Sequence, residues 1–347
     1  MRETRLCENR VRAKHAKNRK DAKAAHGLHI GGCSAFIFQM KTRHHQVIVA
    51  VLTLALCGSA QQVADPDFDT RVAKPAYTQK HPRVLFDEAH NNFHTSTGRY
   101  KPFADLLGSD GYSITPNKQK LTSEALRGFD VLVISNALGA PLMGTPEASN
   151  PAFTEEECDA IRDWVRAGGS LLLIADHAPM GAAAEKLSLR FGVEMSKGYT
   201  ADPSNYDVES NNQGFIKYNR GNNGLGQHPI LEGRNPSERI DNVIAFTGQS
   251  LKGPEGSVAF MKLASTAVDV TPKRGDTPQS EVSAAGRAQG IALTIGKGRV
   301  VVLGEAAMLS AQLAGPQKVK FGMNKPGTDN RQLALNIMHW LSRLIGS

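Results

Sequence analysis

The sequence predicts an α/β protein with a doubly wound, mostly parallel sheet that ends in a β-hairpin and a closing helix. Between residues 83 and 192, strand-length apolar runs alternate with helical patterns, as in proteins with parallel sheets. The runs 131–134 and 171–175 show no polar alternation, which is typical of strands covered by helices on both faces. Near the end of the chain, two apolar runs flank the turn signature Gly296-Lys297-Gly298, and an amphipathic helical pattern follows.

Apolar spacing places the first elements of this sheet. Phe103, Leu106 and Leu107 share one face of a helix that stops at Gly108. In chain order we predict strand 84–86, helix 100–107, strand 112–115, helix 122–126 and strand 131–134.

A capping box opens the next helix, because Thr154 and Glu157 have the spacing at which each side chain satisfies the other residue's backbone N–H. This helix carries Cys158 on its apolar face and ends at Gly168-Gly169. No histidine neighbours Cys158 in sequence, so we interpret the thiol as a core residue and not as a nucleophile. Strand 171–175 and helix 181–191 follow.

After residue 192 the alternation breaks. Residues 193–242 are rich in Asn, Gly and Ser, and we interpret them as a polar insertion that forms a lid or specificity loop. Strands are predicted at 243–246 and 258–261, with the hairpin at 291–295 and 299–303. The closing helix begins near Asp329, and its predicted buried stripe comprises Leu333, Ile337, Trp340, Leu341 and Leu344.

The net charge of +8 lies outside this predicted domain. Residues 1–60 hold 11 of the 41 Lys and Arg and 3 of the 33 Asp and Glu, which leaves 30 of each in the remainder. A neutral remainder argues against nucleic acid as a partner. Three of the four cysteines also lie in residues 1–60, which excludes an internal disulfide framework or cysteine zinc cluster in the rest of the chain.

Residues 40–60 have the order and proportions of a signal peptide. Lys41 and Arg43 precede the apolar run 47–56, and small residues precede a cleavage site near Ala60. The run is too short for a membrane span. We therefore predict an exported protein, periplasmic or secreted, with no transmembrane anchor in its mature chain; a buried strand and lipidation at Cys57 are the alternatives. We interpret residues 1–39 as a basic extension that is not translated in the working protein, and residues 61–82 as a linker or arm.

The candidate functional residues follow the predicted strands, at the edge where open parallel sheets bind ligands. Three of the six histidines after residue 60 fall there. The residues are Asp87, Glu88, His90, Asn91, Asn92 and His94 after the first strand, Ser135 and Asn136 after the third, Asp176 and His177 after the fourth, and Glu305, Ser310 and Gln312 after the hairpin.

Three interpretations of this set remain open. First, His90, His94 and His177 bind a divalent metal, for which zinc is the natural candidate. Second, His177 is a general base oriented by Asp176, Glu305 or Glu88, and the substrate is bound by His90, His94, Asn91, Asn136 and Gln312. Third, the carboxylates cap turns and the histidines form structural hydrogen bonds.

Four segments resemble class I glutamine amidotransferase-like domains, above all exported members and the trehalose-utilisation (ThuA-like) branch. They are VLFDEAH (84–90), FTEEECDAIRDWVRAGGSLLLIADH (153–177), GKGRVVVLGEAAM (296–308) and DNRQLALNIMHWL (329–341). The resemblance spans residues 83–345 and implies a flavodoxin-like sheet with a site at this same edge. In the family, a nucleophilic Cys follows the strand that matches 171–175. Here Asp176 and His177 occupy that turn, so the resemblance implies no Cys-dependent glutaminase activity.

Two hypotheses for function follow. In the first, the domain 83–347 is a hydrolase or isomerase that acts on a small polar, sugar-like substrate. In the second, it is a non-catalytic module that binds a glycan or a protein of the cell envelope. The metal content of the mature protein distinguishes them, and the sequence does not determine the oligomeric state.

Overall fold

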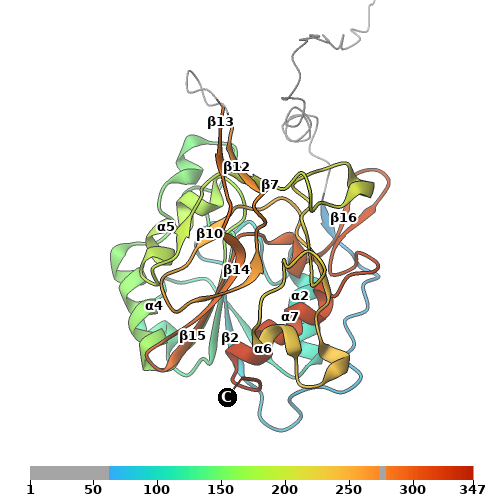
Figure 1. The fold of residues 1–347 in the computed structure, drawn as a ribbon. Coiled ribbons are helices and arrows are strands. Elements are labelled where there is room, and N and C mark those ends of the chain that lie inside the picture. Colours follow the sequence, from blue (N-terminus) through green and yellow to red (C-terminus); the bar gives the residue numbers. More distant parts are fainter. Residues whose placement is uncertain (1–61, 273–278, 347) are drawn as a thin grey trace, which may run out of the picture. The chain divides into compact units, whose positions relative to one another are not determined.

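A nine-stranded sheet organises the computed structural model, which describes residues 62–272 and 279–346 (Figure 1). Its strands are β2 (Arg83–Asp87), β3 (Ser113–Asn117), β4 (Val131–Ser135), β5 (Ser170–Ile174), β6 (Glu194–Met195), β10 (Leu251–Lys252), β11 (Val258–Lys262), β14 (Ala288–Ile295) and β15 (Gly298–Leu303). Five of them run parallel in the order β3-β2-β4-β5-β15. On the far side of β15 the pairing becomes antiparallel, through β14 to β10 and β6, with β11 also paired to β14.

Helices cover both faces of this sheet (Figure 1). One face packs against α2 (Lys101–Ser109) and α7 (Asn330–Leu341), and the other against α3 (Ser123–Leu126), α4 (Glu155–Ala167) and α5 (Met180–Leu189). Successive side chains of a strand point to opposite faces. Leu172 therefore packs with α2 and α7, while Leu173 packs with α4 and α5. Burial on both faces is the reason why these strands lack polar alternation.

The predicted local signals around α4 are confirmed. Thr154 Oγ1 accepts a hydrogen bond from the Glu157 backbone N–H, and the Glu157 carboxylate accepts one from the Thr154 N–H, so both halves of the capping box form. Cys158 is fully buried, and burial raises the pKa of its thiol to about 11. One expectation for the closing helix is wrong: α7 ends at Leu341, so Leu344 leaves the buried stripe and is 37% exposed.

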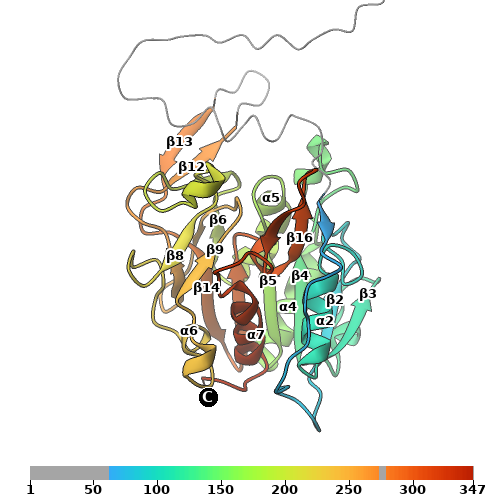
Figure 2. The same ribbon diagram turned by 90° about the vertical axis from the view of Figure 1, so that its right-hand side faces the viewer.

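The polar segment 193–242 contains paired strands of its own. It contributes β6 to the large sheet, and β7 (Tyr199–Ala201) forms a second sheet with β12 (Val268–Thr271) and β13 (Ser280–Ser283). A third sheet joins β8 (Lys217–Asn219) to β9 (Asn242–Ile244), beside the short helix α6 (Pro229–Glu232); Figure 2 shows these elements flanking β14. The 3-10 turns are η1 (Pro146–Ser149), η2 (Val208–Ser210), η3 (Pro236–Glu238) and η4 (Ala307–Leu309).

Residues 62–82 lie along the domain as a docked arm. Strand β1 (Val63–Ala64) pairs with β16 (Ala311–Ala314), which in turn pairs with β17 (Val319–Gly322). Further along, the Ala76 N–H donates to Asp110 Oδ1 at 2.8 Å. Tyr77 packs edge-on against Tyr112, with ring centroids 5.0 Å apart, and its hydroxyl lies 2.7 Å from Ser342 Oγ.

Substitution of Tyr77 by Ala is therefore expected to destabilise the protein by about 2 kcal/mol, roughly half the cost of removing a fully buried aromatic ring. The change removes the aromatic contact to Tyr112 and the hydroxyl contact to Ser342. Urea unfolding of the full chain measures the effect, with Lys80→Ala, an exposed position of the same arm, as the control. Equal stability of the two variants would show that the arm does not contribute to the fold.

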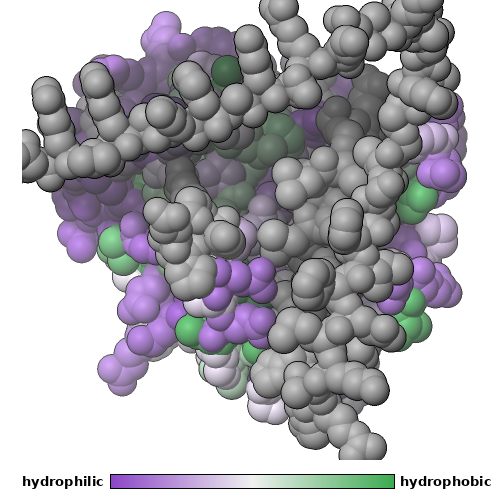
Figure 3. Space-filling model, turned by 90° about the horizontal axis from the view of Figure 1, so that it is seen from above, coloured by the Kyte–Doolittle hydropathy of each residue, from purple (hydrophilic) through white to green (hydrophobic). Residues whose placement is uncertain are grey.

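The predicted basic extension 1–39 and signal peptide 40–60 lie outside the described residues. Within the described part, no helix is both long and apolar enough to cross a membrane. The described surface that is visible from above is mainly hydrophilic, with apolar residues among the polar ones (Figure 3).

Candidate functional site

Two carboxyl groups lie at the edge where the parallel strands β5 and β15 end. These strands are neighbours, with Ile174 opposite Leu303, so the segments that follow them carry Asp176 and Glu305 to the same edge. We call this edge, where β2, β4, β5 and β15 end, the carboxyl edge, and we call Asp176 and Glu305 the acid pair. Glu305 is fully buried and Asp176 is 8% exposed.

Backbone N–H groups hold both members of the acid pair in place. Glu305 accepts hydrogen bonds from the N–H of Ala307 at 2.6 Å and of Met308 at 2.8 Å, at the start of η4. Asp176 Oδ1 accepts from the His177 N–H at 2.8 Å. These contacts fix the orientation of both carboxyl groups without neutralising their charge.

Burial shifts the protonation of the pair. It raises the pKa of Asp176 to about 7, against the lowering effect of its hydrogen bonds. Burial and the neighbouring Asp176 charge raise the pKa of Glu305 well above its ordinary value. No described Lys, Arg or His forms an ion pair with either carboxyl group. Adjacent carboxyl groups with raised pKa values retain protons near neutral pH, as acid–base catalysis requires.

Asn136 connects the end of β4 to the acid pair. Its backbone adopts a left-handed conformation, with φ of 51°, which Asn tolerates better than most residues. In this conformation Oδ1 accepts a hydrogen bond from the Asp176 N–H at 3.0 Å. The side chain is 1% exposed, and its Nδ2 has no hydrogen-bond partner among the described residues. The structure thus places this predicted substrate-binding residue beside Asp176 with a buried donor to spare.

His177 has a free basic nitrogen next to the acid pair. Its Nδ1 lies 2.8 Å from the Ala178 carbonyl oxygen, which only accepts, so Nδ1 carries the hydrogen and Nε2 keeps its lone pair. Burial lowers the pKa of the imidazole and keeps the ring neutral. The half-buried ring stacks on Tyr199, with centroids 4.5 Å apart. This geometry suits a general base.

His94 reaches the same edge from the segment after β2. Its Nδ1 lies 3.1 Å from Ser135 Oγ, and its ring stacks on Tyr100 at 4.6 Å. The Tyr100 hydroxyl donates to the carbonyl of Ala306, next to Glu305, at 2.6 Å. Burial, aided by Arg99, lowers the pKa of His94 to about 3. His94 is therefore a neutral aromatic residue near the pair.

His90 belongs to a different network from the acid pair. Its Nδ1 lies 2.9 Å from both carboxylate oxygens of Asp87, and its Nε2 lies 3.0 Å from Glu157 Oε1. Burial lowers the pKa of His90, but the two carboxylates outweigh burial and raise it overall. With both nitrogens engaged, the ring has no lone pair for a metal or a substrate. It instead links the segment after β2 to the first turn of α4.

Three other predicted site residues lie in contacts of their own. Glu88 accepts from the Ser96 hydroxyl at 2.6 Å and from Lys118 Nζ at 2.6 Å, which makes it an ion-paired anchor of its loop. Asn91 is exposed and donates to the Leu138 carbonyl at 3.2 Å. Gln312 lies on β16 and donates to Ser310 Oγ at 2.7 Å. None of these contacts involves the acid pair.

The predicted three-histidine metal site has no matching arrangement. Across residues 62–272 and 279–346, no group of three or more His, Cys, Asp or Glu side chains could hold a metal ion. The reason is the separation of His90, His94 and His177 into the three environments described above.

Sequence reasoning missed Gln289, which is fully buried beside Glu305. Its Oε1 accepts from the Tyr218 hydroxyl at 2.6 Å, while its Nε2 has no described partner. Only residues that follow strands were considered as candidates. Strand β14 runs antiparallel to β15, so it begins at the carboxyl edge, where β15 ends. The first residues of β14 therefore also belong to the site. The hairpin signature before Gly298 could have revealed the position of Gln289, because a hairpin places the start of its first strand beside the end of its second.

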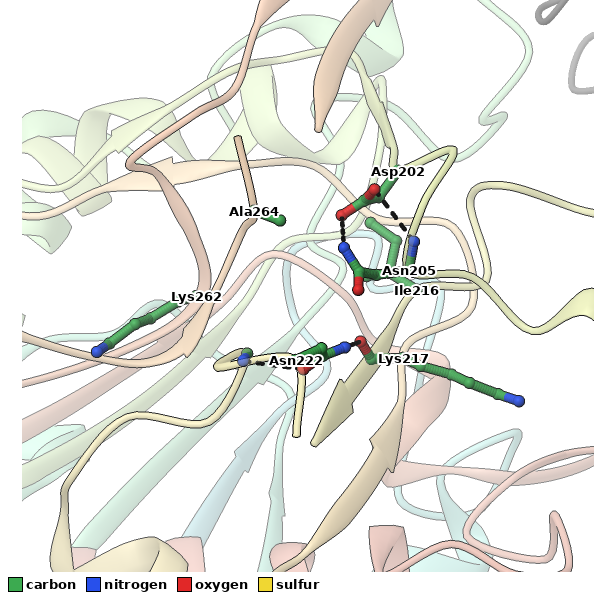
Figure 4. Close-up of a pocket in the computed structure, with 8 residues that line it drawn as sticks. Asp202, Asn205, Ile216, Lys217, Asn222, Lys262 and Ala264 are labelled. Atoms are coloured by element: carbon green, nitrogen blue, oxygen red, sulfur yellow. Dashed lines mark hydrogen bonds between the residues drawn. The ribbon is translucent and has the colours of Figure 1, made fainter. Parts of the chain in front are cut away.

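A shallow hollow in the polar segment lies apart from the acid pair (Figure 4). Asp202 and Asn205 face each other across one side of it, while the side chains of Lys217 and Lys262 extend away. Asp202 accepts from Asn205 Nδ2 at 2.9 Å and from Thr266 Oγ1 at 2.7 Å. Its carboxylate is therefore satisfied within the protein, and we assign no function to this hollow.

No protein-family model and no curated protein matches the chain. Among solved structures, the mmIFT52 N-terminal domain is similar at a TM-score of 0.54 and 16% identity, over 75% of this chain and 97% of that one. A protein from Bacteroides uniformis described as ThuA-like has a TM-score of 0.38 at 13% identity, over 78% and 95%. A protein from Thermoplasma acidophilum, described as part of a GMP synthase, has the same score and identity, over 77% and 97%. The first similarity shows the α/β fold alone, and the other two scores are too low to support an inference.

Proposed function

We propose that this chain is an exported amidotransferase-like protein that catalyses hydrolysis or isomerisation of a small polar, sugar-like substrate at the carboxyl edge. The four motif segments support the family and its ThuA-like branch. The strand order β3-β2-β4-β5-β15 supports the doubly wound, flavodoxin-like topology, because it follows the order 2-1-3-4-5 of that fold. The apolar run 47–56 supports export.

The acid pair is the observation that carries the proposal. With a pKa of about 7, Asp176 can accept a proton from the substrate and return it within one reaction cycle. Burial and the neighbouring Asp176 raise the pKa of Glu305, which favours its protonated form and leaves Asp176 as the main site of negative charge. His177 Nε2 offers a second basic group at the same turn. Both hydrolysis and isomerisation need such paired proton transfers.

The reaction is not Cys-dependent glutamine hydrolysis. His177 lies in the turn where the amidotransferase family has its nucleophile, and the only cysteine after residue 60 is Cys158. That thiol is buried on α4, and its pKa is raised to about 11, so it remains protonated.

A non-catalytic binding module is the second candidate, and a specific observation favours it. Asn136 Nδ2 and Gln289 Nε2 are buried donors without described partners at the carboxyl edge. Buried polar atoms are nearly always hydrogen-bonded, so the two amides indicate a bound polar molecule whether or not it reacts.

A substrate screen with the secreted full chain tests the proposal. Chromogenic glycosides and esters report hydrolysis, and aldose–ketose interconversion reports isomerisation. We expect turnover with at least one class, with kcat/KM rising as the pH increases through about 7, because the base form of Asp176 is the active one. Saccharide binding without any turnover would favour the binding module. N-terminal sequencing of the secreted protein tests cleavage near Ala60.

A further inference from the structure

We propose that the ligand at the acid pair carries an ammonium group next to a hydroxyl, as an amino sugar or amino alcohol does. This inference rests on the proposed use of the carboxyl edge, and it names the chemical class of the ligand. It follows from a charge imbalance, a count of acceptor sites and a buried amide that lacks a partner.

The carboxyl edge has no described cationic side chain to balance the charge of an ionised Asp176. The ion pairs of the described residues do not include Asp176 or Glu305, and the nearby imidazoles of His94 and His177 are neutral. A buried carboxyl group without a counter-charge is unfavourable. A positively charged ligand would supply that counter-charge, whereas a phosphate or a carboxylate would be repelled.

The remaining acceptor sites fit an ammonium group better than a metal ion. A carboxylate offers about four lone-pair sites. Two backbone N–H groups, those of Ala307 and Met308, already donate to Glu305, and Asp176 accepts from the N–H of His177. Ca²⁺ and Mg²⁺ require about six or more oxygen ligands. An ammonium group needs only a few single acceptors, which both carboxyl groups can still provide.

Aromatic rings next to the pair suit the same ligand. Tyr199 and His177 form a half-buried stack beside Asp176, and Tyr100 lies close enough for both carboxyl groups to raise its pKa, although burial is the larger cause. The face of a neutral tyrosine attracts organic cations. Tyr100 is fully buried with one face on His94, so the half-buried Tyr199 ring is the one that, with the carboxyl groups, favours an organic ammonium over a strongly hydrated ion.

The unpartnered amide of Gln289 indicates a hydroxyl on the ligand. Its Nε2 lies beside Glu305: a Cβ placed on Gly248 would be 2.8 Å from this nitrogen and 2.7 Å from Glu305 Cβ. The carbonyl oxygen of Gly304 lies 2.4 Å from the same point, so the three groups pack closely around Gly248. Gln289 Nε2 is a donor, so it needs an acceptor oxygen on the ligand. That oxygen must lie close to the ammonium group that contacts the acid pair. A hydroxyl next to an amine meets both requirements, as in an amino sugar.

Isothermal titration of the full-length protein with matched sugars tests the inference. The probes are D-glucosamine, D-glucose, N-acetyl-D-glucosamine and ethanolamine, at constant ionic strength and neutral pH. We expect D-glucosamine to bind about 10- to 100-fold more tightly than D-glucose, the effect of one charge-assisted contact. The N-acetyl sugar should resemble glucose because its nitrogen is uncharged. Ethanolamine, which keeps the amine and one hydroxyl, should also bind.

Substitution controls locate the contact. Asp176→Asn is expected to abolish the preference for glucosamine, whereas Glu281→Gln, an exposed acid on β13, should preserve it. The wild-type comparison decides the outcome even if Asp176→Asn does not fold. Equal affinity for glucose and glucosamine, or no binding of either amine, would overturn the inference. Turnover of a neutral sugar, with equal affinity for the amine, would overturn the ligand inference but leave the proposed enzymatic function intact. Amine binding without turnover would support the ligand inference and argue against the enzymatic function.

Discussion

Asp176→Asn is expected to lower kcat by about 10²- to 10⁴-fold on whichever substrate the screen identifies, the range for loss of a general acid–base group. Asparagine keeps the shape of the side chain but cannot exchange a proton near neutral pH. The rise of kcat/KM through about pH 7 should disappear in the same variant. Steady-state kinetics from acid to mildly alkaline pH measure both effects.

The matched control is Asp105→Asn on α2, an exposed carboxylate paired with Lys101, which should leave kcat and the pH profile unchanged. Circular dichroism of both variants verifies folding. Full turnover of Asp176→Asn would assign the chemistry to another group, and His177 Nε2 would then be the first residue to test.

The same carboxyl group links stability to pH with a defined sign. The pKa of Asp176 in the folded protein is raised above its ordinary value of 3.8 to about 7. The contribution of Asp176 to the free energy of unfolding is therefore fully present below about pH 4 and is lost as the pH rises through 7. The loss is on the order of 4 kcal/mol at 1.36 kcal/mol per pKa unit. Stability should fall over the range in which activity rises, and urea unfolding at several pH values measures this slope.

His90→Ala is expected to destabilise the protein by about 3–5 kcal/mol, as when one partner of a buried ion pair is removed. The imidazole lies 2.9 Å from the Asp87 carboxylate oxygens and 3.0 Å from Glu157 Oε1, and all three side chains are almost fully buried. Without the ring, two buried carboxylates would lose their common partner. Urea unfolding at neutral pH measures the cost.

The pH dependence distinguishes this network from simple packing. Because the pKa of His90 is raised in the folded protein, its contribution to the free energy of unfolding is complete below about pH 6.5. It is lost as the pH rises through the pKa of the folded protein. The lowered pKa of Glu157 means that its contribution is lost as the pH falls below its ordinary 4.5. The effect of His90→Ala should therefore peak between these limits. His81→Gln is the exposed control, and a cost that is independent of pH would argue against the ionic link.

Much of the architecture was predictable from local pattern. Strands β4 and β5 were evident as unbroken apolar runs because both of their faces are covered, and Thr154 with Glu157 marked the start of α4 because a capping box needs only four consecutive residues. The positions of Asp176 and Glu305 also followed, since residues after parallel strands emerge at one edge. Their proximity required knowing that β5 and β15 are neighbours, which depends on sheet order and not on local pattern.

The sequence by itself determined the α/β alternation, the carboxyl edge and the absence of a cysteine at the turn after β5. Tertiary structure alone decided what each residue at that edge contacts. His90 and His94 are four residues apart, yet His90 bonds to Glu157 on α4, while His94 stacks on Tyr100 near the acid pair. Gln289 joins the site because β14 runs antiparallel to β15. Periodicity records which residues are buried, but partners far apart in the chain are set only when the sheet is assembled and the helices pack against it.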